Sequence, residues 1–214
     1  MTTPKQVLQR ITDIGVVPVV TLGDHTLAEP LADALVGGGL PVVEITLRSP
    51  AGVPAIEVLA KRDDVLIGAG SVRSSAEATA AISAGCDFIV SPGFDSSIVD
   101  IAAGSGVLGI PGVATATELM RARNLGVDVV KFFPAEAAGG LAALRALAAA
   151  FPDVRFIPTG GISGANGRRY LDESFVVAVG GSWMIDDTAL AAGDWEAVTE
   201  AAAEAAHLGE GDRS

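Results

Sequence analysis

Several chemically useful side chains are scarce in this chain. It has one cysteine, Cys86, and two histidines, His25 and His207. A single cysteine excludes a disulfide within the chain and is typical of proteins from reducing compartments. Because there is no cluster of cysteines and histidines, a zinc site of that kind is not expected. A Ser-His-Asp triad would have to use one of two histidines that have no supporting sequence context.

Positive charge and long apolar runs are scarce as well. The formal net charge is -12, which argues against nucleic acid as a partner, because nucleic-acid binding rests on clustered Lys and Arg. A small anionic ligand needs only local positive potential and remains compatible with this composition. No apolar run approaches the length of a membrane span, and the first residues lack the apolar core of a signal peptide. We therefore expect a soluble, cytoplasmic protein with no membrane partner.

Lysine occurs only three times, and one of the three has unusual surroundings. Lys5 lies near the start of the chain and Lys61 stands in a polar run, whereas Lys131 is embedded in the apolar run 127–133, which ends at Pro134. A buried ammonium group is costly, so a lysine held there tends to lose its proton and become nucleophilic. If this protein performs amine chemistry, Lys131 is the residue that performs it.

Short apolar runs rich in Val and Ile alternate with amphipathic or Ala-rich segments along the whole chain. The expected strands are 16–21, 41–47, 65–68, 88–91, 107–110, 127–133, 154–158 and 176–179. The expected helices are 3–14, 26–36, 51–61, 75–84, 96–103, 117–125, 141–151, 165–171, 188–191 and 194–207, and the whole Ala-rich tract 135–150 also favours helix. Short runs rich in Val and Ile are typical of buried parallel strands.

Eight strand–helix units without a linker predict one α/β domain spanning residues 1–214. The expected architecture is a single (β/α)8 TIM barrel with an additional N-terminal helix, and residues 208–214 are expected to be a frayed tail. A doubly wound open sheet is the alternative fold. The Gly68-Ala-Gly70 sequence would suit a dinucleotide-binding turn there, but no third glycine follows and the acidic partner is unclear.

Polar side chains gather at the ends of the predicted strands, which form the active-site face of such a barrel. Glu44, Thr46 and Arg48 share one face of the second strand, because side chains alternate along a strand. The second and sixth strands lie opposite one another in an eight-stranded barrel. Glu44 and Lys131 can therefore meet in its centre, either for catalysis or as an ion pair that only fills the interior.

Glycine pairs follow the last two predicted strands, in the segments Thr159-Gly-Gly-Ile-Ser163 and Gly180-Gly-Ser-Trp183. Glycine lets backbone amides approach an anion, and the loops after strands seven and eight are the usual phosphate seat of this fold. The alternative is a pair of tight turns that need glycine for a positive φ. The position of both pairs favours phosphate binding.

Two longer segments, 39–48 and 126–139, resemble the signature segments of the 2-keto-3-deoxy-6-phosphogluconate (KDPG) aldolases. This class I, Schiff-base family is also credited with 4-hydroxy-2-oxoglutarate aldolase activity. The segments 91–93, 158–163 and 180–183 fit as well, so the resemblance covers about 8–206. It implies a (β/α)8 barrel, commonly a homotrimer, that needs no metal and no cofactor.

The resemblance also implies roles for individual residues. Lys131 would form the imine, Glu44 would transfer protons, and Arg48 would hold the pyruvate carboxylate with help from Ser71, a position that is often threonine in the family. Some relatives carry an arginine where this chain has Thr21, so the carboxylate here would depend more on Arg48. The remaining substrate contacts would be Pro92, Phe133, Thr159, Gly160, Gly161, Gly180, Gly181 and Ser182.

The implied reaction is the reversible cleavage of a phosphorylated keto acid, KDPG, to pyruvate and D-glyceraldehyde 3-phosphate. Thr159 and Ser182 resemble the gluconate-type rather than the galactonate-type members. The alternatives are a galactonate-type relative, a phosphosugar isomerase or epimerase on the same barrel, and a non-catalytic phosphosugar-binding barrel. The isomerase would explain the glycine loops and an acid, but it has no use for a buried lysine.

Overall fold

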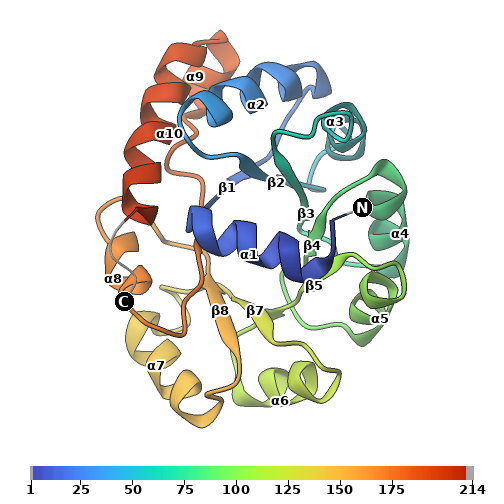
Figure 1. Ribbon diagram of the computed structural model, residues 1–214, viewed down its shortest axis with the longest axis vertical. Helices are drawn as coiled ribbons and strands as arrows, with labels where there is room; N and C mark the ends of the chain where they lie inside the picture. Colours follow the sequence, from blue (N-terminus) through green and yellow to red (C-terminus); the bar gives the residue numbers. More distant parts are fainter. Residues whose placement is uncertain (1, 211–214) are drawn as a thin grey trace.

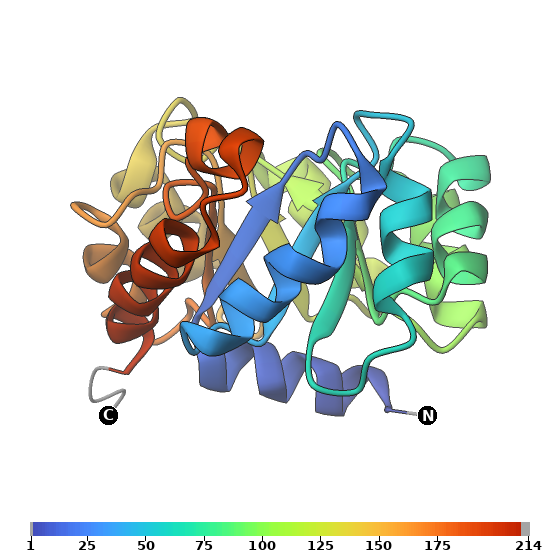
Figure 2. The same ribbon diagram turned by 90° about the horizontal axis from the view of Figure 1, so that it is seen from above.

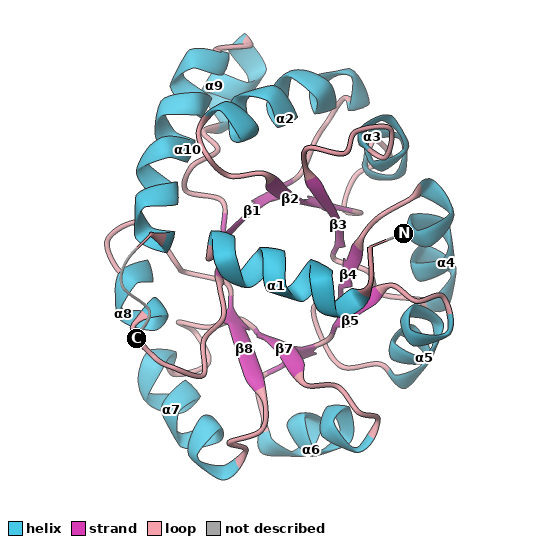
Figure 3. Cartoon of the chain, in the orientation of Figure 1, coloured by secondary structure: helices cyan, strands magenta, loops and turns pink. Residues whose placement is uncertain are grey.

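Helices surround a curled parallel β-sheet in the computed structural model, which describes residues 2–210 (Figures 1 and 3). The strands are β1 (Val16–Val20), β2 (Val42–Thr46), β3 (Leu66–Gly70), β4 (Phe88–Val90), β5 (Leu108–Ile110), β6 (Gly112–Val113), β7 (Val129–Phe132), β8 (Arg155–Pro158) and β9 (Val179–Gly181). All described pairings between these strands are parallel. The predicted α/β class is therefore confirmed.

Most of the helices lie between successive strands in the sequence and outside them in space (Figure 3), whereas the first precedes β1 and the last two follow β9. The helices are α1 (Pro4–Ile14), α2 (Ala28–Gly37), α3 (Gly52–Leu59), α4 (Ser75–Ala84), α5 (Ser96–Gly104), α6 (Ala116–Asn124), α7 (Gly140–Ala150), α8 (Gly167–Leu171), α9 (Asp187–Ala192) and α10 (Trp195–Gly209), with a 3-10 turn, η1 (His25–Leu27). None of the helices within residues 2–210 is long and apolar enough to cross a bilayer.

The strands form two sheets rather than the one continuous eight-stranded sheet that the sequence predicts. The main sheet has six strands in the order β5-β4-β3-β2-β1-β9, and the second has three in the order β6-β7-β8. Pro111 separates β5 from β6, and a proline has no N–H to donate to a ladder. Between β8 and β9 the pairing is reduced to two isolated bridges, Phe156↔Val176 and Thr159↔Gly180.

The N-terminal helix α1 lies across the end of the strands where their N-termini meet (Figures 1 and 2). Thr3 begins this helix with a capping box to Gln6, which satisfies backbone donors that a helix start leaves unpaired. Val7 and Ile11 are buried in a cluster of apolar strand residues that includes Phe88. The predicted additional helix therefore covers one end of the strands, and the polar residues gather at the other.

Three segments differ from the sequence-based expectation. The last strand is Val179–Gly181 rather than 176–179, because Val179–Gly181 pairs with β1, and this pairing outweighs the turn propensity of Gly180-Gly181. The tract 135–139 is not helical: the amides of Ala135 and Glu136 donate to the carbonyls of Thr159 and Gly160 at 2.8 and 3.1 Å. Of the predicted tail 208–214, the structure describes only residues 208–210, and Leu208 and Gly209 belong to α10.

Candidate active site

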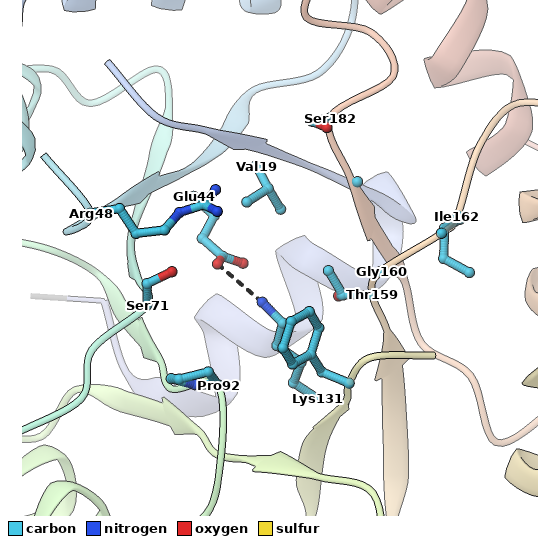
Figure 4. Close-up of a pocket in the computed structure, with 13 residues that line it drawn as sticks. Val19, Glu44, Arg48, Ser71, Pro92, Lys131, Thr159, Gly160, Ile162 and Ser182 are labelled. Atoms are coloured by element: carbon cyan, nitrogen blue, oxygen red, sulfur yellow. Dashed lines mark hydrogen bonds and ion pairs between the residues drawn. The ribbon is translucent and has the colours of Figure 1, made fainter. Parts of the chain in front are cut away.

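One cavity opens at the C-terminal ends of the strands, with a volume of 190 Å³ (Figure 4). Its walls come from both sheets and from the loops that follow β2, β3, β4, β7, β8 and β9. The lining residues are Val19, Glu44, Arg48, Ser71, Pro92, Lys131, Phe133, Thr159, Gly160, Gly161, Ile162, Gly181 and Ser182. Residues more than 160 positions apart in the sequence thus line one space.

Lys131 and Glu44 face each other at the bottom of this cavity (Figure 4). The Nζ atom of Lys131 donates to Oε1 of Glu44 at 3.2 Å, and the two residues are only 6 % and 3 % exposed. Lys131 comes from β7 and Glu44 from β2, so the pair joins the two sheets. The predicted contact is confirmed. It places an amine and a carboxylate within proton-transfer distance in a largely buried site.

Glycines on β3 make room for Glu44 and for the neighbouring Phe88. A Cβ atom on Gly70 would lie 2.3 Å from Oε1 of Glu44, and one on Gly68 would lie 2.2 Å from the ring of Phe88. The Gly68-Ala-Gly70 sequence is therefore part of a buried strand and is required by packing. Its interpretation as a dinucleotide-binding turn is wrong, because such a turn follows a strand and does not lie within one.

Two further side chains at the cavity have special geometry. Ser71, directly after β3, has φ +56. It is the only non-glycine residue with a positive φ within residues 2–210. Such a conformation costs about 1–3 kcal/mol and concentrates at functional sites. The ring centroid of Phe133 lies 5.2 Å from Nζ of Lys131, within the range of a cation–π contact. Phe133 therefore bounds the space around the amine.

The loop after β8 is held against the loop after β7. Gly160 and Gly161 have φ +96 and +78, and a Cβ on Gly161 would lie 2.7 Å from Cβ of Glu136. The hydroxyl of Tyr170 on α8 donates to the Glu136 carboxylate, and burial together with this carboxylate raises the pKa of Tyr170. The glycines thus place backbone without side chains on the cavity wall, and the contact with Glu136 holds this loop in position.

The cavity includes eleven of the twelve site residues that the sequence analysis named. The exception is Gly180, which does not line it but lies against Thr159: a Cβ there would be 2.4 Å from the Thr159 hydroxyl oxygen. Val19 and Ile162 also line the cavity and were not predicted. The alternation along β1 could have indicated Val19, whereas no sequence signal distinguishes Ile162 from an ordinary core residue.

The cysteine and the two histidines of residues 2–210 lie outside this cavity. Cys86 is buried among apolar side chains, and burial raises the pKa of its thiol to about 12, so it is a poor nucleophile. His25 and His207 are exposed and contact Asp24 and Glu210. No group of three or more His, Cys, Asp or Glu side chains within this described range is arranged to hold a metal ion.

Comparison with known proteins agrees with this arrangement. The family model described as "Aldolase: KDPG and KHG aldolase" matches residues 7–201. A 2-dehydro-3-deoxy-phosphogluconate aldolase of Pseudoalteromonas atlantica is 44% identical over 89% of this chain and 89% of its own. The KHG/KDPG aldolase of Escherichia coli K12 is 44% identical over 91% and 92%.

A solved structure is similar as well. The KDPG aldolase of Legionella pneumophila, with pyruvate captured at low pH as a covalent carbinolamine intermediate, is 39% identical and has a TM-score of 0.89, covering 94% of this chain and 97% of that one. The family model spans most of the sequence, and the identities exceed what fold similarity alone requires. The chain belongs to the KDPG and KHG aldolase family.

Proposed function

We propose that this protein is a class I aldolase that reversibly cleaves KDPG to pyruvate and D-glyceraldehyde 3-phosphate through an imine on Lys131. The observation that carries the proposal is the buried Lys131–Glu44 pair, 3.2 Å apart at the bottom of a cavity with Arg48 at its mouth. Membership of the aldolase family supports the same reaction. No cofactor or metal takes part in the proposed chemistry, because the imine itself accepts the electrons.

The first half of the reaction forms the imine. Glu44 accepts a proton from Nζ of Lys131, and the neutral amine attacks the C2 ketone of the substrate. The protonated Glu44 then gives its proton to the hydroxyl of the carbinolamine, which leaves as water. The iminium that remains withdraws electrons from the C3–C4 bond.

The second half breaks the carbon–carbon bond. Glu44, again a carboxylate, removes the C4 hydroxyl proton, and C3–C4 cleavage releases D-glyceraldehyde 3-phosphate and leaves an enamine on Lys131. Protonation at C3 and addition of water then release pyruvate and free the amine. Arg48 and Ser71 hold the keto-acid carboxylate, while Pro92 and Phe133 bound the reacting carbons and Thr159 lies beside them.

The glycine loops after β8 and β9 hold the phosphate at the far end of the substrate. Gly160, Gly161, Gly181 and Ser182 line the cavity wall there, and Gly180 supports them through Thr159. A hold on the remote phosphate orients the C3–C4 bond against Lys131 and Glu44. The same lysine chemistry extends to 4-hydroxy-2-oxoglutarate, which gives pyruvate and glyoxylate and needs no phosphate contact.

Trapping of the imine tests this function. The protein incubated with pyruvate and reduced with borohydride is expected to gain the mass of one reduced pyruvate adduct per chain, and the modified peptide is expected to contain Lys131. The reason is that Lys131 is the buried lysine that reaches the cavity. Peptide mass spectrometry makes the measurement, with a borohydride-only sample as the control.

The outcomes separate the proposal from its alternatives. A phosphosugar isomerase, or a barrel that only binds phosphosugars, would gain no adduct. An adduct on Lys5 or Lys61 would contradict the mechanism above. Comparing turnover of KDPG with turnover of its galactonate epimer distinguishes a gluconate-type from a galactonate-type aldolase.

Gly161→Ala tests the phosphate end. An alanine at φ +78 would be strained, and its Cβ would crowd Glu136 at 2.7 Å, so the loop must move. Displacement of the loop from the phosphate is expected to raise the KM for glyceraldehyde 3-phosphate in the condensation direction about tenfold, equivalent to about 1.4 kcal/mol of lost binding. The pyruvate concentration that half-saturates imine trapping should change by less than about twofold.

Gly126→Ala is the matched control for that variant. Gly126 has φ +79, almost the same as Gly161, and nothing lies within 4 Å of the Cβ that would be added there. Both variants should lose stability because of the positive φ, and Gly161→Ala should lose more because of its contact with Glu136; thermal unfolding measures both losses, and only Gly161→Ala should raise the aldehyde KM. An unchanged KM in Gly161→Ala would place the phosphate elsewhere.

The higher-order architecture is proposed on the same basis. Residues 1–214 form one domain, and the two sheets are arcs of one eight-stranded barrel in which β5 and β6 are a single strand interrupted at Pro111. The bridges between β8 and β9 support its closure. We also propose that the protein is a homotrimer. We further propose that it is cytoplasmic, which agrees with the presence of a single cysteine. Light scattering of the purified protein measures the mass of the assembly.

A further inference from the structure

Two threonine hydroxyls hold the guanidinium group of Arg48. Its Nη2 donates to Oγ1 of Thr21 at 2.9 Å, and its Nε donates to Oγ1 of Thr46 at 3.5 Å. The two threonine oxygens are themselves hydrogen-bonded at 2.8 Å. Thr21 follows directly after β1 and lies level with Thr46 on β2, because these strands pair with Val20 opposite Ile45. The guanidinium is thus fixed from two strands.

Both acceptors of Arg48 are neutral, whereas several other arginines of this acidic chain pair with carboxylates. Arg62 and Arg73, for example, pair with aspartate or glutamate. Within residues 2–210, no carboxylate lies within 4 Å of the Arg48 guanidinium. A guanidinium has five N–H donors, and the threonines engage two of them. The positive charge and three donors of Arg48 are left for an anion in the cavity.

Thr21 makes the shorter of the two bonds and acts at the end of the side chain. Arg48 is exposed, and a long exposed side chain loses considerable conformational freedom when it is held in one position. Thr46 accepts from Nε, whereas Thr21 accepts from the terminal nitrogen Nη2 and so sets the direction of the guanidinium plane. As a β-branched residue, Thr21 is itself stiff at χ1.

We infer that Thr21 is a positioning residue, whose hydroxyl orients Arg48 toward the carboxylate of the keto-acid substrate. The inference rests on the proposed function of Arg48. It assigns to Thr21 a share of the affinity for the carboxylate and no part in bond breaking. Thr21 touches the guanidinium and does not line the cavity.

Thr21→Val and Thr21→Ser test the inference, because valine has the shape of threonine without the hydroxyl and serine keeps the hydroxyl. Borohydride trapping is measured over a range of pyruvate concentrations. Thr21→Val is expected to raise the half-saturating concentration about 5- to 20-fold, equivalent to about 1–2 kcal/mol. The KM for KDPG should rise similarly, with kcat at saturation changed less than about threefold. Thr21→Ser should remain within about twofold of the wild type.

A double-mutant cycle shows whether Thr21 acts through Arg48. In an Arg48→Ala background, Thr21→Val is expected to have no further effect, because the group that it orients is gone. Thr79→Val is the matched control: its hydroxyl donates to the carbonyl of Ser75 on α4, outside the cavity. Thermal unfolding of all variants separates loss of affinity from loss of structure.

Three results would overturn the inference. They are an unchanged half-saturation in Thr21→Val, an equal effect of Thr21→Val with and without Arg48, and failure of Thr21→Ser to restore affinity. Failure of the proposed function looks different, because the wild type itself would then form no adduct on Lys131. If the wild type forms the adduct and Thr21→Val does not change its half-saturation, only the proposed role of Thr21 is contradicted.

Discussion

Lys131→Met is expected to abolish imine trapping by pyruvate and to lower the turnover of KDPG by about 10⁴-fold or more, the scale seen when other enzymes lose a covalent nucleophile. Methionine has a similar length and fits the same apolar strand, but it has no amine to attack the ketone. Turnover is measured by coupling pyruvate release to its reduction, and the adduct by mass spectrometry. Lys61→Met is the matched control, because Lys61 is exposed and lies outside the cavity.

Lys131→Met has a second consequence that a surface lysine cannot have. It leaves the carboxylate of Glu44, 3 % exposed, without its cationic partner. Removing one member of a buried pair typically costs about 3–5 kcal/mol of folding free energy. The double variant Lys131→Met with Glu44→Gln is expected to recover much of this stability without recovering activity. Trapping or turnover that persists in Lys131→Met would contradict the mechanism outright.

Glu44→Gln is expected to lower kcat about 10²- to 10⁴-fold, the range for loss of a general acid–base group. The amide has the size of the carboxylate and can still accept a hydrogen bond from Lys131, but it cannot take up and return protons. Lys131 remains present, so imine trapping should still occur, only more slowly. The informative measurement therefore compares the loss of kcat with the loss in the final extent of imine trapping. We expect kcat to fall more than the extent of trapping.

An exposed glutamate provides the control for Glu44→Gln. Glu57 lies on α3, is exposed, and does not line the cavity, so Glu57→Gln should keep wild-type turnover and trapping. Turnover in Glu44→Gln equal to that of the wild type would remove Glu44 from the proton transfers. Complete loss of trapping in that variant would assign to Glu44 a structural role in holding Lys131.

Two local signals predict part of the site, and the resemblance to the aldolase family implies the remaining substrate contacts, such as Pro92 and Phe133. Lys131 is the lysine in an apolar run, and the cost of a buried ammonium group makes it a candidate nucleophile without any tertiary information. The glycine pairs and Arg48 stand at the ends of predicted strands, and the ends of parallel strands meet on one face, which predicts that they line one site. Patterns of this kind involve only a few neighbouring residues, so they can be recognised in the sequence alone.

Other features depended on contacts between distant segments. The tract 135–139 has the composition of a helix, yet its amides bond to the loop after β8. The sequence Gly68-Ala-Gly70 suggests a nucleotide turn, yet it makes space for Glu44 and Phe88. In both cases a tertiary contact outweighed the local propensity, which is worth only about 1 kcal/mol or less per residue.

By itself, therefore, the sequence determined the α/β class, the alternation of strands and helices, and the candidacy of Lys131, Glu44 and Arg48. Only the tertiary structure decided that Lys131 lies 3.2 Å from Glu44, 87 residues away, and that Thr21 holds Arg48. The physical reason is that hydrophobic period and turn residues specify each element separately. Which side chains meet across the cavity depends on the curvature and register of the strands, and these are set by the packing of the whole chain.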